Sequence, residues 1–347
     1  MSDVYVGIDV GKNFSAVCVR DHEGTEIFVD RIETLQKDAW LKLLGRFKGS
    51  RIHAAFEVGA HYDWMYDMLL PFCEEVIVVA PPDKKPRKKT DRIDAAGLSR
   101  DLWRGALVGI FVPPAYMRQD RRLVAHLHSL SAQISRTKTK LRDILYTARL
   151  TCRYSDLSGG KAQAWLTEVV LPQLCEQDRL FFEQLLEQLK LFEKQYNTNY
   201  ARAKQHLGNY SDANLARSIP GFGPLVTLAI LCAMGRIGRF ETPDQFASYF
   251  GLCGRVDQSG DRFQILAITR RGNSHVRWLL GQAVTHLIRM DPKVGRRYKK
   301  LRRKKKSKVA RVALMRWIAT ILWRMLNANE PYRINGKKGN YRIKSAA

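Results

Sequence analysis

Four acidic side chains are spaced so that they could share metal ions. Asp9 and Glu57 each follow a short apolar run, the pattern of a strand that ends at a carboxylate on the edge of a sheet. Asp91 and Asp94 are three residues apart, which places both on one face of a helix. Two strand ends and one helix face can bring four carboxylates together in a small volume.

Carboxylates that are crowded together repel one another, so such a cluster needs hard cations. Mg²⁺ takes oxygen ligands and keeps waters and substrate phosphates in its coordination shell, and Mn²⁺ can substitute for it. Two such ions can clamp a phosphodiester during an in-line displacement. The four acids therefore predict a metal-dependent phosphoryl-transfer site that acts on nucleic acid.

The overall charge favours the same class of substrate. The 347 residues carry a formal net charge of +26, and a field of that sign attracts polyanions, above all nucleic acid. No apolar run is long enough to span a bilayer and no signal peptide is evident, so we expect no membrane partner. The six cysteines contain no Cys-x-x-Cys pair and the histidines show no ligand spacing, which argues against a zinc site.

Residues 1–112 alternate strand and helix patterns. Three leading strands are followed by strand–helix alternation, which predicts a mixed α/β sheet in the ribonuclease-H-like order. The predicted strands are 4–8, 15–19, 26–32, 52–56 and 76–80, and the predicted helices are 39–47, 62–70 and 91–102. A basic loop precedes the Asp91–Asp94 pair, and we expect it to contact nucleic-acid phosphates, although a solvated surface loop is the alternative. Its cations are Lys84, Lys85, Arg87, Lys88 and Lys89.

Residues 113–208 have the pattern of long helices. Apolar side chains recur at spacings of four and three between Leu123 and Ile144, and again between Phe182 and Tyr196. This coiled-coil seam predicts either an antiparallel pair within the chain or an intermolecular coiled coil that forms dimers.

Residues 209–330 form a second predicted globular unit, mostly helical, and a basic tail follows at 331–347. Gly221 and Gly223 lie in a turn that leads into a helix, which resembles the hairpin of helix-hairpin-helix DNA-binding motifs. A plain helix–helix turn is the alternative.

The C-terminal end of the chain is strongly basic. From residue 289 onward, 20 Lys or Arg residues face only Asp291 and Glu330, a local net charge of +18. One further helix is predicted after the densest basic run. Five aromatic residues are interleaved with the cations and could stack on bases, but packing explains them equally well. They are Tyr298, Trp317, Trp323, Tyr332 and Tyr341.

Two sets of motifs together resemble a known family. The first set is Gly-Ile-Asp-Val-Gly-Lys at 7–12, Phe-Glu-Val-Gly-Ala at 56–60 and Lys-Thr-Asp-Arg-Ile-Asp-Ala at 89–95. The second set is Ser-Ile-Pro-Gly-Phe-Gly at 218–223, Tyr-Phe-Gly-Leu at 249–252, Ser-Gly at 259–260 and Thr-Arg-Arg-Gly-Asn at 269–273. In this order they resemble the DEDD-type insertion-sequence transposases, a group that includes the Piv DNA invertase. One departure is Val58, where the family usually has a small residue followed by Thr-Gly.

The resemblance implies a RuvC-like nuclease domain joined to a transposase domain with a nucleophilic serine. Asp9, Glu57, Asp91 and Asp94 match the metal-binding acids, and Ser259 matches the catalytic serine. Arg270 and Arg271 are expected to contact phosphates.

The family also implies partners and a location. They are target and donor DNA, a structured noncoding bridge RNA that pairs with both, and further copies of the chain as a dimer or a dimer of dimers. The expected location is the prokaryotic cytoplasm, at the nucleoid.

Three other readings of the sequence remain open. A RuvC-like nuclease could cut branched DNA by hydrolysis, without a serine link. A non-enzymatic RNA-binding protein could have kept the fold. Sugar kinases and actin-like ATPases also open with Gly-Ile-Asp-x-Gly, but the further phosphate and adenosine loops that they need are missing.

Overall fold

A computed structural model describes residues 2–81, 90–259, 262–268, 272–334 and 337–338, and for 255–259, 262–267 and 337–338 it describes the backbone alone. The chain forms two compact units, Met1–Val112 and Pro113–Ala347. The basic loop at 84–89 and the arginines at 270 and 271 lie outside the described residues. In the described part of the chain, no helix combines the length and the apolar character needed to cross a membrane.

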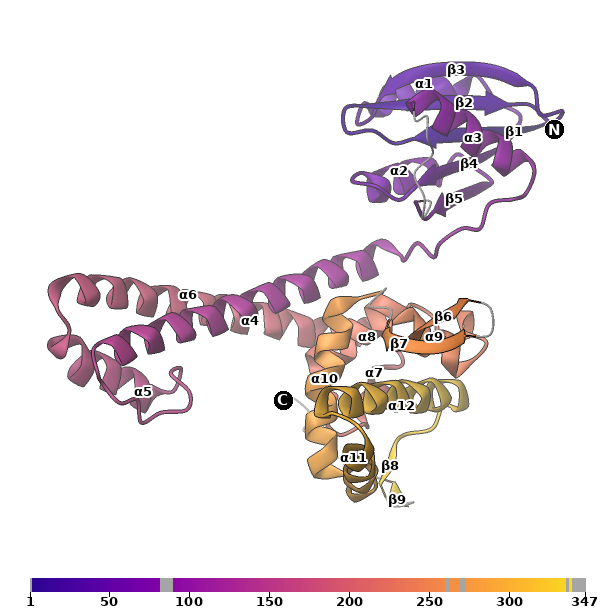
Figure 1. Cartoon of the computed structure of the whole chain (residues 1–347). Coiled ribbons are helices and arrows are strands. Elements are labelled where there is room, and N and C mark those ends of the chain that lie inside the picture. The colour runs from indigo at the N-terminus through magenta and orange to yellow at the C-terminus, as the bar shows by residue number, and fades with distance from the viewer. Residues whose placement is uncertain (1, 82–89, 260–261, 269–271, 335–336, 339–347) are drawn as a thin grey trace. The chain divides into compact units, whose positions relative to one another are not determined.

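The first unit confirms the predicted mixed α/β sheet (Figure 1). Its five strands lie in the order β3-β2-β1-β4-β5, in which β1 pairs antiparallel with β2 and parallel with β4. The strands are β1 (Asp3–Asp9), β2 (Phe14–Arg20), β3 (Glu26–Glu33), β4 (Arg51–Glu57) and β5 (Glu75–Val79). The helices are α1 (Lys37–Gly45), α2 (Tyr62–Leu69) and α3 (Asp91–Trp103).

The two faces of this sheet are packed differently. Large apolar side chains such as Ile8, Phe56 and Trp40 form the core that α1 and α2 share with the sheet. On the other face, α3 packs on β1, β2 and β4 through small residues, among them Ala16, Cys18 and Ala95. Small side chains let the α3 backbone come close to the strands, which fixes the position of the helix on the sheet.

The predicted seam closes within the chain. The helices α4 (Ala115–Thr147) and α6 (Glu176–His206) pack along each other as an antiparallel hairpin, so that Phe182 near the start of α6 joins Leu141 near the end of α4 in one core. The short helices that join them, which the sequence pattern did not predict, complete that core. They are α5 (Gly160–Trp165), η1 (Leu166–Val170) and η2 (Leu171–Gln173).

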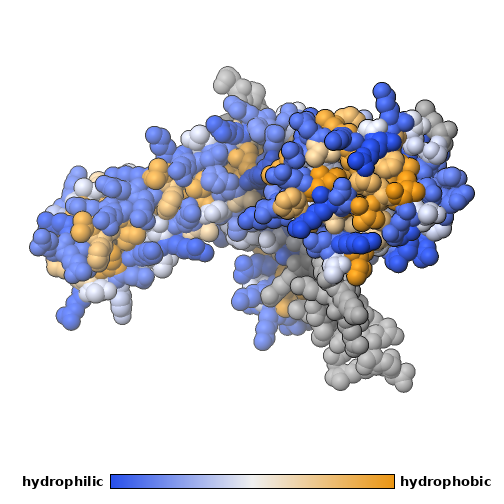
Figure 2. All heavy atoms as spheres, turned by 90° about the horizontal axis from the view of Figure 1, so that it is seen from above, coloured by the Kyte–Doolittle hydropathy of each residue, from blue (hydrophilic) through white to orange (hydrophobic). Residues whose placement is uncertain are grey.

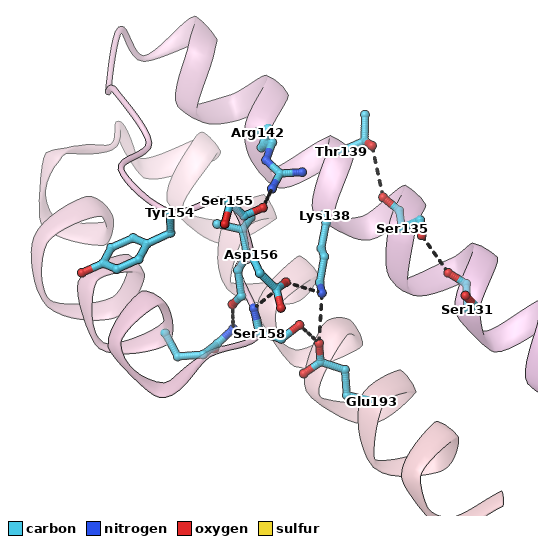
Figure 3. A network of polar contacts seen from close by, with 12 residues as sticks. Ser131, Ser135, Lys138, Thr139, Arg142, Tyr154, Ser155, Asp156, Ser158 and Glu193 are labelled. Atoms are coloured by element: carbon cyan, nitrogen blue, oxygen red, sulfur yellow. Dashed lines mark hydrogen bonds and ion pairs between the residues drawn. The ribbon is translucent and has the colours of Figure 1, made fainter. Parts of the chain in front are cut away.

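Polar contacts hold the connection between the two hairpin helices in place (Figure 3). The ammonium group of Lys138 on α4 bonds the Asp156 carboxylate at 2.7 Å and approaches Glu193 of α6 at 3.6 Å. The hydroxyl of Ser158 also donates to Glu193. The outer surface of the hairpin is largely hydrophilic, with some hydrophobic side chains at its far end (Figure 2).

The hairpin joins the helical core of the second unit at its base. There Asp120 of α4, which is only 1% exposed, contacts His206 Nδ1 at 2.5 Å and accepts a hydrogen bond from the Tyr210 hydroxyl at 2.6 Å. Burial, followed by this bond to Asp120, raises the pKa of Tyr210 well above its usual value. These contacts attach α4 and the end of α6 to the same core.

Helix α8, in which residues 225–234 are all buried, is at the centre of that core. The elements in this part of the chain are η3 (Leu207–Asn209), α7 (Ala213–Arg217), α8 (Pro224–Met234), η4 (Ile237–Arg239), α9 (Pro243–Tyr249), β6 (Gly254–Ser259), β7 (Arg262–Ile268), α10 (Ser274–Met290), α11 (Pro292–Lys304), α12 (Ser307–Ala328), β8 (Arg333–Ile334) and β9 (Lys337–Lys338). The sequence predicted one helix after Met290, and the residues described after it form two, α11 and α12. Helix α11 was missed because its 13 residues include eight cations and only Val294 is fully buried.

Candidate active site

The two strand-end acids are neighbours in the first unit. Strands β1 and β4 are parallel, with Ile8 opposite Phe56, and the next residue in each strand is Asp9 and Glu57, respectively. Both carboxylates are partly buried. Their proximity therefore follows directly from the register of the two strands.

Both acids lie on the face of the sheet that α3 covers. A Cβ atom added to Gly7 would come within 2.2 Å of the Ala95 carbonyl oxygen and 2.3 Å of the Ser99 amide nitrogen, so the α3 backbone rests on β1 at this glycine. Side chains alternate along a strand, so Asp9 shares the face of Gly7. Gly7 is opposite Ala55, which puts Glu57 on that face as well.

The helix adds Asp94 to the same region. Glu57 and Asp94 line one open pocket of about 770 Å³, together with Arg20, Glu26 and Arg100. The hydroxyl of Thr90 caps α3 by accepting a hydrogen bond from the Ile93 amide at 3.3 Å. This cap fixes the first turn of the helix.

The fourth acid is placed differently. Asp91 is the first residue of α3 and is exposed, whereas Asp94, one turn later, is partly buried. The structure therefore places Asp9, Glu57 and Asp94 around the end of β1 and β4, with Asp91 on the solvent side of the helix.

The described side chains do not form a ready-made metal cage. Among the residues that the structure describes, no three His, Cys, Asp or Glu side chains are close enough together to hold an ion. The expected gathering of all four carboxylates is thus not present in these side-chain positions. Like charges repel at short range, and only a cation can offset that repulsion. The oxygen-only donors on two adjoining strand ends and a helix nonetheless fit a hard divalent ion.

The candidate nucleophile lies in the second unit, at the end of a hairpin that the sequence pattern did not predict. Ser259 is the last residue of β6, and its backbone is paired with Arg262, the first residue of β7. Residues 260–261, which connect the two strands, lie outside the described part of the chain. A short turn between paired strands presents its flanking residues at one tip of the ribbon.

Two other motifs of this unit meet in the structure. A Cβ on Gly272, which has a φ of +91°, would lie 2.3 Å from the Tyr249 carbonyl oxygen. The guanidinium of Arg277 donates to the carbonyl oxygens of Phe250 at 3.2 Å and Gly272 at 3.1 Å. Asn273 caps α10 by accepting bonds from the amides of His275 and Val276. The motif at 249–252 and residues 272–273, the described end of the second motif, are therefore joined at the start of α10.

A histidine pair lies beside this junction. The rings of His128 on α4 and His275 on α10 are 4.6 Å apart, and the ring of Trp278 packs edge-on to His128 at 4.7 Å. Burial, followed by the nearby His128, lowers the pKa of His275 from its ordinary value. No sequence pattern indicates this pair, because its members are 147 positions apart and on different helices.

The two glycines of the predicted hairpin motif have different surroundings. Gly221 has a φ of +89°, and a Cβ there would lie 2.7 Å from the Ala283 carbonyl oxygen of α10. Packing within the protein is therefore sufficient reason for a glycine at 221. Gly223, the N-cap of α8, is exposed and has no atom within 4 Å of such a Cβ. Of the two, only Gly223 leaves space for a ligand at the backbone.

Comparisons with known proteins find similarity in two segments of the chain. Residues 6–149 match the DEDD transposase model of the IS110 group, and residues 213–300 match the model of the transposase IS116/IS110/IS902 family. The chain is 24% identical to the transposase for insertion sequence element IS1111A of Coxiella burnetii, an alignment that covers 96% of this chain and 92% of that protein. It is 22% identical to the transposase for insertion sequence element IS1328 of Yersinia enterocolitica, over 84% of this chain and 86% of that protein.

Proposed function

Because the chain belongs to the IS110 family of transposases, which are enzymes that act on DNA, we propose that it is the RNA-guided recombinase of an insertion sequence. The observation that carries the proposal is the pairing of β1 with β4, which makes Asp9 and Glu57 neighbours beside α3 in the domain that matches the DEDD model. A carboxylate group of this kind suits phosphoryl transfer, and the net charge of +26 suits a nucleic-acid substrate.

Four acidic residues of the first unit would hold Mg²⁺, or Mn²⁺ in its place. They are Asp9, Glu57, Asp91 and Asp94. When bound, the metal would neutralise charge on the phosphate and lower the pKa of an attacking hydroxyl. Asp91 is exposed and one turn from Asp94, so it can act as a direct ligand or hold a water of the coordination shell.

Ser259 is the proposed nucleophile. Its hydroxyl oxygen forms a bond to the phosphorus of the DNA backbone, and the bond to the 3′-oxygen of the cut strand breaks, so that this oxygen leaves as a 3′-hydroxyl. The phosphoserine link keeps the energy of the phosphodiester. A 3′-hydroxyl then attacks the same phosphorus and displaces the serine, which rejoins the DNA.

The carboxylates and the serine belong to different units of the chain. We propose that a complete site combines the acids of one protomer with the serine of another in a dimer or a dimer of dimers. Such an arrangement prevents cutting until the whole complex has formed. The partners are target DNA, donor DNA and a structured bridge RNA, in a prokaryotic cytoplasm at the nucleoid. The loop at 84–89, Gly223, Arg270 and Arg271 are proposed to contact phosphates.

The test is the capture of the covalent intermediate. Wild-type protein, incubated with labelled DNA, its RNA and Mg²⁺, should give slowly migrating protein–DNA adducts on a denaturing gel. Ser259→Ala should abolish these adducts and recombination while DNA binding remains. Ser248→Ala on α9 and Ser274→Ala at the start of α10 are matched controls that should keep both activities. Adducts that persist in Ser259→Ala would disprove the assignment.

One observation favours a second candidate, a hydrolytic nuclease. The unit that contains the four acids has its own core and is compact without the unit that contains Ser259. If the same gel shows free cut ends and no adduct for the wild type, hydrolysis is the better description.

A further inference from the structure

Helix α11 carries a concentration of positive charge that the proposed chemistry does not use. Eight of its 13 residues, Pro292–Lys304, are Lys or Arg, and none is acidic. Lys305, Lys306 and Lys308 continue the series, and all of these cations are exposed. Cations three and four residues apart repel one another along a helix, which destabilises it in isolation.

The protein supplies little to compensate this charge. Within the described residues, no cation of α11 forms an ion pair with Asp or Glu. The adjacent Asp291 is 1% exposed and serves the fold, because it caps α11 through the Lys293 amide at 2.8 Å and accepts a bond from the Tyr332 hydroxyl at 2.7 Å. A row of cations on a helix surface, without acidic partners, is typical of a surface that binds a polyanion such as a nucleic acid.

The structure also distinguishes between the aromatic residues near this helix. The Trp323 indole donates to the Phe240 carbonyl oxygen at 3.0 Å, and Tyr332 is buried against Asp291. The Tyr298 hydroxyl bonds Ser307 and closes the turn between α11 and α12. These three side chains have packing roles. Tyr332 lines a pocket together with Trp317, but Trp317 differs because it carries the guanidinium of Arg297 over its ring at 5.0 Å.

That pocket lies between α11, α12 and the segment that follows α12. It is open, has a volume of about 470 Å³ and combines the apolar side chains Trp317, Ile321 and Met325 with the cations Arg297 and Arg324. The acidic residues Asp291 and Glu330 line it as well, and Asp291 is almost fully buried in its bonds to the fold. Arg333 also lines it and pairs with the exposed Glu330 at 3.2 Å. A flat aromatic wall with guanidinium groups around it suits a planar base that carries a phosphate.

From this combination we propose that the α11–α12 surface binds an unpaired nucleotide of a nucleic acid, with the base in the Trp317 pocket and the flanking phosphates on α11. A base that is still paired in a duplex is stacked between its neighbours and cannot enter such a pocket. The ligand is therefore a single-stranded segment, a loop or a bulge, in RNA or DNA. This proposal rests on the proposed function in one respect: it takes from it that the ligand is a nucleic acid. It does not depend on Ser259 or on the four acids.

The test uses full-length protein and oligonucleotides that carry 2-aminopurine at one unpaired position. The probes are an RNA hairpin with a single-nucleotide bulge, the same hairpin without the bulge, a single-stranded DNA and a form with an abasic site at the bulge. We expect 2-aminopurine fluorescence to fall on binding as the base stacks. We also expect the abasic and fully paired forms to bind about 10-fold more weakly, the effect of one lost base stack. Comparison of the affinities for the RNA and DNA probes shows which of the two nucleic acids the site prefers.

Variants separate the pocket from the helix. Trp317→Leu should remove the fluorescence change and the preference for the bulged base, while the salt dependence of binding remains. The double variant Arg302→Gln, Arg303→Gln should weaken all probes alike and reduce the slope of log affinity against log salt by about 1.4 to 1.8, since two phosphate contacts are lost. Lys194→Gln, an exposed cation of α6, is the matched control and should behave as wild type.

Circular dichroism melting of each variant confirms that it is folded before binding is compared. The proposal is overturned if wild-type protein binds the bulged and abasic probes equally, or if Trp317→Leu keeps the full fluorescence change. Adducts that persist in Ser259→Ala would disprove the serine assignment and leave the 2-aminopurine result unaffected, so the two proposals can fail independently.

Discussion

At the scale of single residues, the strand-end acids are distinguished by their neighbours. Asp9 and Glu57 end adjacent strands on the face that α3 covers, whereas Glu33 ends β3 at the edge of the same sheet and is exposed. All three look alike in the sequence, as a carboxylate at the end of a strand. Their surroundings differ, because Asp9 and Glu57 have each other and Asp94 nearby, and we therefore expect different chemistry.

This contrast gives a direct prediction. Asp9→Asn and Glu57→Gln should each lower the rate of DNA cleavage by at least about 100-fold, because loss of a direct ligand should cost more than loss of a group that merely positions one. Their melting temperatures should stay equal or rise, since each change removes charge repulsion. Glu33→Gln is the matched control and should cleave normally in the same assay. Normal cleavage by Asp9→Asn would exclude a metal-binding role for that residue.

The pH dependence of stability should report on His275. Its pKa in the folded protein lies below the ordinary value of 6.5, through burial and then the nearby His128, so the unfolded chain takes up this proton first as the pH falls. The stabilisation is therefore complete above about pH 6.5 and is lost as the pH falls through the lower, folded-state pKa.

Urea unfolding between about pH 7.5 and 5 tests this, because this interval spans the ordinary pKa of histidine. His275→Gln should lose less free energy of unfolding over that interval than the wild type. His126→Gln, an exposed histidine of α4, should follow the wild-type curve. Parallel curves for wild type and His275→Gln would contradict the prediction.

At the scale of elements, the contact between α3 and β1 determines where Asp94 lies. The helix backbone comes so close to Gly7 that no side chain fits between them. This position is internal to a strand, where glycine would otherwise be unfavourable. Close approach to a neighbouring backbone is the physical reason for it.

Gly7→Ala should therefore displace α3 from the sheet. We expect a loss of about 1–3 kcal/mol in the free energy of unfolding, typical of overpacking a core, together with reduced cleavage. Gly45→Ala, at the end of α1, meets no atom within 4 Å and should be neutral or stabilising by up to about 1 kcal/mol. Chemical denaturation measures both, and an unchanged stability in Gly7→Ala would show that α3 is not held as tightly as the structure indicates.

The hairpin shows where an apolar pattern stops being informative. The seam along α4 and α6 is the same whether the partner helix belongs to this chain or to another copy. Contacts far apart in the sequence decide it here, because Phe182 packs with Leu141 and Asp120 is buried against His206 and Tyr210. Exposed apolar residues such as Leu180, Phe181 and Leu191 remain on its surface, so the closed hairpin does not exclude contacts between copies.

At the scale of the whole molecule, charge and metal should act separately. In the proposed function, binding of nucleic acid depends on the excess of Lys and Arg, which gives the net charge of +26, whereas cutting depends on the acids of the first unit.

Removal of divalent ions with EDTA should therefore abolish cleavage and adduct formation but leave binding to labelled DNA within a few-fold. Addition of Mg²⁺ or Mn²⁺ should restore cleavage, and Ca²⁺ in its place serves as a comparison. A gel that resolves binding and cutting in the same sample provides the measurement. Cleavage that continues in EDTA would rule out the metal-dependent site.

The sequence by itself determined the order of strands and helices in the first unit and the positions of its acids. These depend on local patterns: apolar alternation over a few residues, a cap such as Thr90, and a carboxylate where an apolar run stops. The sequence analysis did not predict the β6–β7 hairpin or helix α11. In these segments polar and basic residues interrupt the apolar periodicity that indicates a strand or a helix.

Only the tertiary structure decided which residues act together. It placed Glu57 and Asp94 in one pocket, filled the space beside Gly221 with α10, and left Trp317 in the wall of an open pocket while the Trp323 indole bonds a backbone carbonyl. The physical reason is the same in each case. A segment's own pattern fixes which of its faces is apolar, but the identity of the partner that covers that face depends on contacts between residues far apart in the chain.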